Sequence, residues 1–213
     1  MTQPTITTRP LLAVAFSFLA ALSSGPVYAA EDTEPPLNYT LKIGDQSVRV
    51  VPGVAADVKG TFTDPKVTLV PDDHRTFGYG GMTFAYPSNF AFEADFSTDG
   101  LKFWTLDGNN FVIMIHHYEA EKVAPADLAA VMKDSYGDGT KTEPVSHTFN
   151  GNKLAGIRIL ATVAGTSLIQ DILALPAKKG SRVLILQDLS PQEKVSDDES
   201  KQVFKLLGET LAP

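Results

Sequence analysis

The chain has 213 residues, no cysteine, 18 basic and 25 acidic residues, and a net charge of −7 at pH 7. Without cysteine there can be no disulfide, thiolate nucleophile, thiolate metal ligand or lipid anchor on an N-terminal cysteine. The acidic balance argues against nucleic acid and anionic membrane surfaces as partners, and the one close basic pair, Lys178-Lys179, is interpreted as a polar turn. The length suits one domain of ordinary size.

Residues 1–29 have the pattern of a cleavable secretory signal peptide. Arg9 precedes an apolar run of 12 residues (11–22), and Val27-Tyr28-Ala29 places small residues at the −3 and −1 subsites of a signal peptidase. Cleavage before Ala30 would leave 17 basic and 25 acidic residues, and so a net charge of −8. The alternative is an uncleaved anchor, but a spanning helix needs about 20 apolar residues. We expect an exported protein, periplasmic or extracellular, with no membrane span in the mature chain.

The first part of the mature chain is predicted to be a flexible N-terminus followed by a β extension. Residues 30–36 are charged and contain prolines, which is typical of a flexible segment. The extension (37–76) contains two alternating runs joined by Gly44-Asp45, which predict a β-hairpin over residues 39–51, and a further strand at residues 66–70. We interpret Asp72-Asp73-His74 as a solvated loop before a strand.

A second unit (77–213) contains the clearer core. Four short runs predict antiparallel strands, at residues 82–86, 90–95, 101–106 and 111–118. After a helix, four more are predicted at residues 142–149, 153–164, 166–175 and 181–189. Asn150-Gly151 predicts a two-residue hairpin loop, because both central positions of a type I′ turn need positive φ. Residues 111–115 and 183–186 are apolar on both faces of a strand, and such strands need cover on both sides.

Two helices could supply that cover. Residues 125–136 start with a proline and have Leu128, Val131, Met132 and Tyr136 at helical spacing. At the C-terminus, Ser196-Asp197-Asp198-Glu199 fits a capping box. An apolar stripe follows it, made of Val203, Leu206, Leu207 and Leu211. The order strands, helix, strands, helix predicts an α+β fold with a mainly antiparallel sheet.

Three local patterns occur within this order: an opening run at residues 82–90, the hairpin at residues 149–156, and the closing helix with Phe204 and Leu207. Together they resemble the PsbP-like superfamily over residues 77–211. The resemblance implies an antiparallel sheet flanked by helices on both faces, a PsbP-like α/β/α sandwich. It also implies an accessory or binding component rather than an enzyme, as in the extrinsic subunits of photosynthetic oxygen evolution. No functional residue transfers from the family to this chain.

Other motifs in the sequence are incomplete. Residues 134–139 resemble a calcium loop, but Tyr136 fills a position that needs an oxygen ligand and Val145 replaces the bidentate glutamate, so we expect a helix end. Residues 78–81 lack the lysine and the helix of a phosphate loop, and no Gly-x-Ser-x-Gly elbow exists. Trp104 fits a core position better than a carbohydrate platform. Carboxylate pairs for glycoside hydrolysis depend on tertiary distances, and 25 acidic residues make coincidence the expectation.

The histidines are the remaining candidates for metal or acid–base chemistry. His116 and His117 are adjacent on a predicted strand, so they point to opposite faces and cannot chelate one metal together. His74, His116 and His147 could meet only in the tertiary structure. We therefore predict no catalytic, metal-binding or cofactor-binding residue.

Two hypotheses follow. The first is an exported, non-catalytic binding or accessory protein whose partner is another protein or a small molecule. The alternative is a small hydrolase or metal-dependent enzyme whose site forms only in the fold. This alternative predicts a deep polar pocket that contains at least two of His74, His116 and His147.

Overall fold

The computed structural model describes residues 30–189 and 198–213. The elements are β1 (Tyr39–Ile43), β2 (Gln46–Val50), β3 (Val67–Pro71), β4 (His74–Phe77), β5 (Phe84–Pro87), β6 (Ala91–Asp95), β7 (Leu101–Asp107), β8 (Phe111–Tyr118), α1 (Pro125–Tyr136), β9 (Lys141–Phe149), β10 (Asn152–Val163), β11 (Thr166–Leu175), β12 (Ser181–Asp188) and α2 (Asp198–Thr210). Neither of these helices is long and apolar enough to cross a membrane. The predicted signal peptide lies outside the described residues and stays a prediction.

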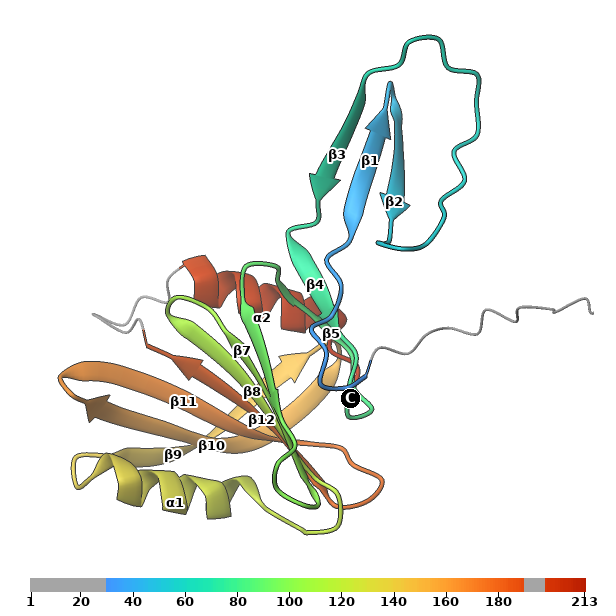
Figure 1. Cartoon of the computed structure of the whole chain (residues 1–213). Helices are drawn as coiled ribbons and strands as arrows, with labels where there is room; N and C mark the ends of the chain where they lie inside the picture. Colours follow the sequence, from blue (N-terminus) through green and yellow to red (C-terminus); the bar gives the residue numbers. More distant parts are fainter. Residues whose placement is uncertain (1–29, 190–197) are drawn as a thin grey trace, which may run out of the picture.

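A three-stranded antiparallel sheet, β2-β1-β3, projects from the rest of the molecule (Figure 1). Its register places Leu41 opposite Val48 on β2 and Leu69 on β3. Because paired residues share a face, one face of this sheet is apolar and the other carries polar residues such as Arg49. The predicted hairpin and the strand after it are confirmed.

The main sheet has seven antiparallel strands in the order β6-β7-β8-β12-β11-β10-β9. β12 comes last in the sequence but lies between β8 and β11, where it joins the two halves of the sheet. β9 and β10 are connected through Asn150 (φ 44°) and Gly151 (φ 77°). Both angles are positive, as a type I′ turn requires, so the predicted hairpin is confirmed.

Different kinds of structure cover the two faces of this sheet. On one face lie β4, β5 and α2, whose residues Phe77, Phe84 and Leu207 are at most 1% exposed. On the other face α1 packs against β9, β10 and β11, with Ala129 buried. The strands that are apolar on both faces are therefore buried on both sides.

The predicted α/β/α sandwich, with helices flanking the sheet on both faces, is wrong. The described structure is mostly antiparallel β-sheet, divided among three sheets, with two helices. The prediction assumed that helices must cover strands that are apolar on both faces. Instead, the small β4-β5 sheet and its aromatic side chains supply much of the cover on one face, and α1 packs mainly against β9, β10 and β11 on the other.

The helices themselves lie where the sequence predicts them. α1 has the predicted bounds and ends at Gly137, which confirms a helix end in place of the rejected calcium loop. Val131, predicted to face the core, is 66% exposed. Leu128 and Met132, which are four residues apart, lie on the face of α1 that packs against the core, and Val131 lies outside that face. In α2, Val203 is fully buried as predicted.

The first turn of α2 has a contact that the sequence does not suggest. The predicted capping box starts at Ser196, which lies outside the described residues. The Glu199 carboxylate accepts hydrogen bonds from the backbone N–H groups of Asn109 (3.0 Å) and Asn110 (2.7 Å). Glu199 therefore ties the start of α2 to the turn between β7 and β8.

β4 lies at the predicted boundary between the two units of the chain. β4, which pairs with β5, is not predicted, because His74-Arg75-Thr76 is polar and shows no apolar alternation. It crosses residues 76 and 77, between which the second unit was predicted to begin. The division into an extension (37–76) and a second unit (77–213) stays a prediction.

Candidate functional site

The histidines of the enzyme alternative lie in separate places. His116 and His117 point to opposite faces of β8, as predicted. His116 packs edge-on against Phe103, with ring centroids 4.4 Å apart, and burial lowers the pKa of His116 to about 4. His147 is on β9, with β12, β11 and β10 between it and β8. His116 and His147 are therefore four strand spacings apart, which is a separation of about 19 Å across the sheet.

His74 lies in the separate β4-β5 sheet. Its Nδ1 is 2.7 Å from Oδ1 of Asp73, whereas Asp72 accepts a hydrogen bond from the Thr40 hydroxyl (3.3 Å). Within residues 30–189 and 198–213, no group of three or more His, Asp or Glu side chains could hold a metal ion. His74, His116 and His147 therefore do not belong to such a group.

His147 belongs to a buried polar cluster beneath α2. Asp171, 2% exposed, accepts two hydrogen bonds from Arg158, to Oδ1 at 2.6 Å and to Oδ2 at 2.7 Å. His147 Nε2 lies 2.7 Å from the same Oδ2, and its ring packs against Phe204 of α2. Burial alone raises the pKa of Asp171, but the hydrogen bonds from Arg158 and His147 outweigh it and hold the pKa below its usual value. The Asp171 carboxylate is fully engaged within the fold.

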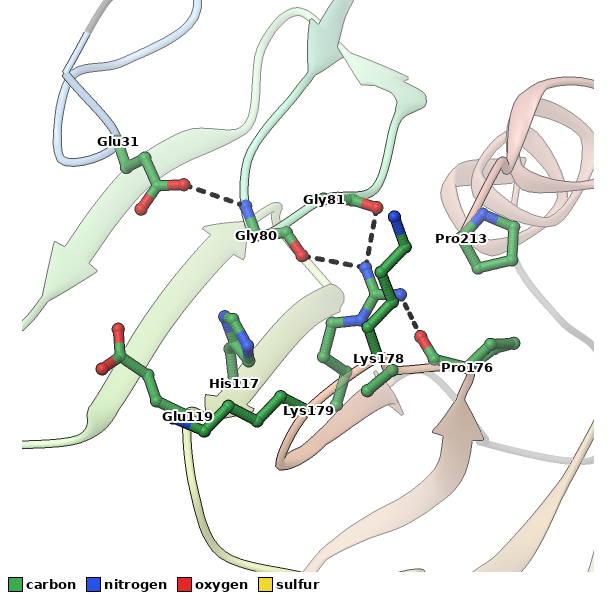
Figure 2. Close-up of a pocket in the computed structure, with 11 residues that line it drawn as sticks. Glu31, Gly80, Gly81, His117, Glu119, Pro176, Lys178, Lys179 and Pro213 are labelled. Carbon is green, nitrogen blue, oxygen red and sulfur yellow. Dashed lines mark hydrogen bonds between the residues drawn. The ribbon is translucent and has the colours of Figure 1, made fainter.

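A cleft of about 860 Å³ lies at the end of the main sheet where β8 and β11 finish and β12 begins (Figure 2). Besides Pro213, four stretches of chain, far apart in the sequence, form its walls. They are Glu31 near the start of the described chain, Gly80-Gly81 between β4 and β5, His117 and Glu119 at the end of β8, and the β11–β12 connection with Arg182.

Arg182 forms the floor of this cleft. It occupies the second position of β12, on the same face as the buried Leu184, and is 8% exposed. Its Nη1 donates to the carbonyl oxygens of Gly80 and Gly81, both at 2.8 Å, and its Nη2 donates to the carbonyl of Pro176. One guanidinium therefore connects two loops that are about a hundred residues apart. Burial lowers the pKa of Arg182.

Glu31 closes the opposite wall. Its carboxylate accepts hydrogen bonds from Lys102 Nζ (2.8 Å) and from the Gly80 N–H (3.3 Å), and its carbonyl accepts one from Trp104 Nε1 (2.7 Å). Burial raises the pKa of Glu31, but the bonds from Lys102 and Gly80 lower it to a net value below the usual one. Lys102 also lies 3.4 Å from Glu119, so one lysine pairs with both carboxylates at the cleft.

The segment predicted to be flexible, residues 30–36, is thus held against the core. Besides the contacts of Glu31, the Thr33 carbonyl accepts a hydrogen bond from the Tyr79 hydroxyl (2.5 Å) and the Pro35 carbonyl accepts one from Arg75 (2.6 Å). Trp104, fully buried as predicted, is one of the anchors. The sequence shows that both this segment and the core contain hydrogen-bonding groups, but it does not indicate that these groups bond to each other.

Sequence reasoning also missed the cleft residues. Lys178-Lys179 does form a turn between β11 and β12, but the turn stands at the rim of a cleft. A signal for Arg182 was present: it alternates with Leu184 and Leu186 in a strand predicted to be buried, so it had to face the core. A charged residue at such a position usually has a specific role.

Comparison with known proteins finds likeness at the level of structure. No family model and no curated protein sequence matches the chain. One solved structure that matches is LpqN, described as involved in cell envelope biogenesis of Mycobacterium tuberculosis, with 14% sequence identity and a TM-score of 0.34 over 66% of this chain and 91% of LpqN. This likeness is too weak to carry an argument about function. No comparison supports the resemblance to the PsbP-like superfamily, and none assigns the chain to a family.

Proposed function

We propose that this chain is an exported, non-catalytic binding protein and that the cleft at Arg182 is its binding site. The observation that carries the proposal is the construction of the cleft. Its volume of about 860 Å³ falls within the range of small-molecule sites. Its walls are fixed before any ligand arrives, because buried Arg182 holds the carbonyls of Gly80, Gly81 and Pro176 in place.

The bonding of the polar groups favours binding over chemistry. Both carboxylates at the cleft, Glu31 and Glu119, are paired with Lys102, and hydrogen bonding lowers the pKa of Glu31. A general acid or base works best when its pKa lies near the pH at which the enzyme acts. A carboxylate whose pKa is depressed by a lysine stays ionised and is suited to holding a wall of the cleft. The proposal that the protein acts after export rests on the predicted signal peptide.

Native mass spectrometry of the chain purified from its own exported fraction tests this function. We expect a bound small molecule or partner, and we expect the variant Ala177→Trp, which puts a large side chain into the cleft, to lose it. Ala130→Trp places the same side chain on the exposed surface of α1 and should retain the bound species. Equal retention by Ala177→Trp, or turnover of substrates by the purified chain in a hydrolase panel, would contradict the proposal.

A further inference from the structure

We infer that the ligand of this cleft is an organic anion. Its carboxylate or phosphate head meets Arg182 and the two lysines, Lys178 and Lys179, and its apolar body lies against Pro176 and Ala177. The inference rests on the proposed function, because it names the class of ligand for the same site. Three features of the cleft support this class of ligand: its distribution of charge, the bonding of Arg182, and the apolar part of its wall.

The charges around the cleft do not balance. Its side-chain carboxylates, Glu31 and Glu119, are both paired with one lysine, Lys102. Lys178 and Lys179 line the cleft and have no ion-pair partner among the described residues. The chain as a whole is acidic, so this site is a local exception to its net charge of −7. A region of uncompensated positive charge attracts anions.

Arg182 is the most informative of these cations. Charged groups that are buried are usually paired with an opposite charge, because removing them from water is costly. Within the described part of the chain, Arg182 is bonded only to the carbonyls of Gly80, Gly81 and Pro176. A guanidinium has five N–H donors, and these three bonds leave two of them unused. A carboxylate or phosphate oxygen is the acceptor that suits an arginine best.

His117 adds a neutral polar group beside this charge. Burial, and then the charges of Arg182 and Lys102, lower the pKa of His117 and so favour the uncharged ring. Its Nδ1 is buried and has no hydrogen-bond partner among the described residues. Figure 2 shows the ring between Glu119 and the Gly80 backbone, facing the cleft. A neutral imidazole can donate one hydrogen bond to an anion without repelling it.

The remaining wall is apolar. Pro176 and Ala177 line the cleft next to the lysines. A bare inorganic ion would leave most of a cleft of about 860 Å³ filled with water. A molecule with an apolar body would cover these residues while its head group meets the cations. This favours an organic anion over a simple inorganic one.

Calorimetric titration with three probes that share one apolar body tests the inference. The probes are heptanoate, hexyl phosphate and the uncharged hexanol, each of which carries a hexyl chain. We expect both anions to bind and hexanol not to bind, and the ratio of the two anion affinities tells a carboxylate ligand from a phosphate ligand. Added salt should weaken both anions, because the attraction is electrostatic. If hexanol binds as tightly as either anion, or if neither anion binds, the inference is overturned.

Variants separate the cleft from nonspecific charge. Lys178→Gln/Lys179→Gln changes exposed side chains, so the fold should survive, and we expect about a tenfold loss of anion affinity. Lys133→Gln/Lys141→Gln removes the same charge from α1 and β9 and should leave affinity unchanged. Equal losses in both variants would refute the site. If native mass spectrometry shows an uncharged species that Ala177→Trp displaces, the binding function stands and only the anion inference falls.

Discussion

Replacing Asp171 with Asn tests the role assigned to the polar cluster beneath α2. The substitution preserves the shape of the side chain but removes its charge. Arg158 then loses its counter-ion, and the new amide group can no longer accept a hydrogen bond at the position that faces His147. We expect a folded but clearly less stable protein, because a buried carboxylate with three short hydrogen bonds has been replaced by a group that satisfies fewer of them.

The geometry sets the size of the effect. Breaking a buried ion pair by removing one partner costs about 3–5 kcal/mol. The Asp171 side chain is 3% exposed, but those of Arg158 and His147 are 29% and 20% exposed, so water can screen part of the loss. We therefore expect the lower end, about 3 kcal/mol at pH 7. In a protein of this size that lowers the melting temperature by about 6–12 °C.

The pH dependence gives a second, independent signature. The pKa of Asp171 is lower in the folded protein than in the unfolded chain, so its stabilisation is complete above the unfolded pKa of about 3.9. It is lost as the pH falls through the folded value. The difference in unfolding free energy between the two proteins should thus shrink as the pH falls below about 4.

Urea denaturation at several pH values, with thermal melts at pH 7, makes the comparison. Asp138→Asn is the matched control, because Asp138 is exposed in the turn after α1. The control should match the wild type within about 0.5 kcal/mol. If Asp171→Asn melts within about 1 °C of the wild type, or if its difference from the wild type does not shrink in acid, the cluster does not stabilise the fold as described.

Three further substitutions probe the fold, each followed by chemical denaturation. Gly156→Ala should cost about 3 kcal/mol, since its Cβ would lie 1.8 Å from the Ile172 carbonyl oxygen, whereas Gly139→Ala meets no atom within 4 Å and should be tolerated. Gly151→Val should cost about 1–2 kcal/mol, because φ is 77° there, and unchanged stability would count against the hairpin. Glu199→Ala should lower the free energy of unfolding by about 1–2 kcal/mol, because the hydrogen bonds to the β7–β8 turn are lost. Unchanged stability would show that these hydrogen bonds do not stabilise the fold.

Local patterns in the sequence predict the elements of this fold well. The alternation and turn residues around β11, and the helical spacing of α1, give the observed bounds. The layers could not be predicted in the same way. Apolar residues on both faces of β8 and β12 show that both faces are covered, but they do not show by what. Phe77 and Phe84 belong to the β4-β5 sheet and cover one face of the main sheet. The sequence around them does not distinguish a strand of this second sheet from a strand of the main sheet.

The candidate site was harder to predict because its parts meet only through tertiary contacts. Arg182 and Gly80 are 102 residues apart, and nothing near Gly80 in the sequence indicates an arginine partner. The opposite directions of His116 and His117 were predictable, since adjacent residues on a strand always face apart. Which of the two histidines lines a cleft depends on the elements that cover each face of the main sheet. The prediction of those elements was wrong.

The position of β12 determines when the main sheet can be completed. β6-β7-β8 and β9-β10-β11 can each form from neighbouring segments, but only the pairing of β12 with β8 and β11 unites them. During synthesis this strand emerges after almost all of the chain. Such late, long-range pairing delays folding. If the predicted signal peptide is used, the nascent chain therefore reaches the export machinery without a finished core, in the extended state that passage through a narrow channel requires.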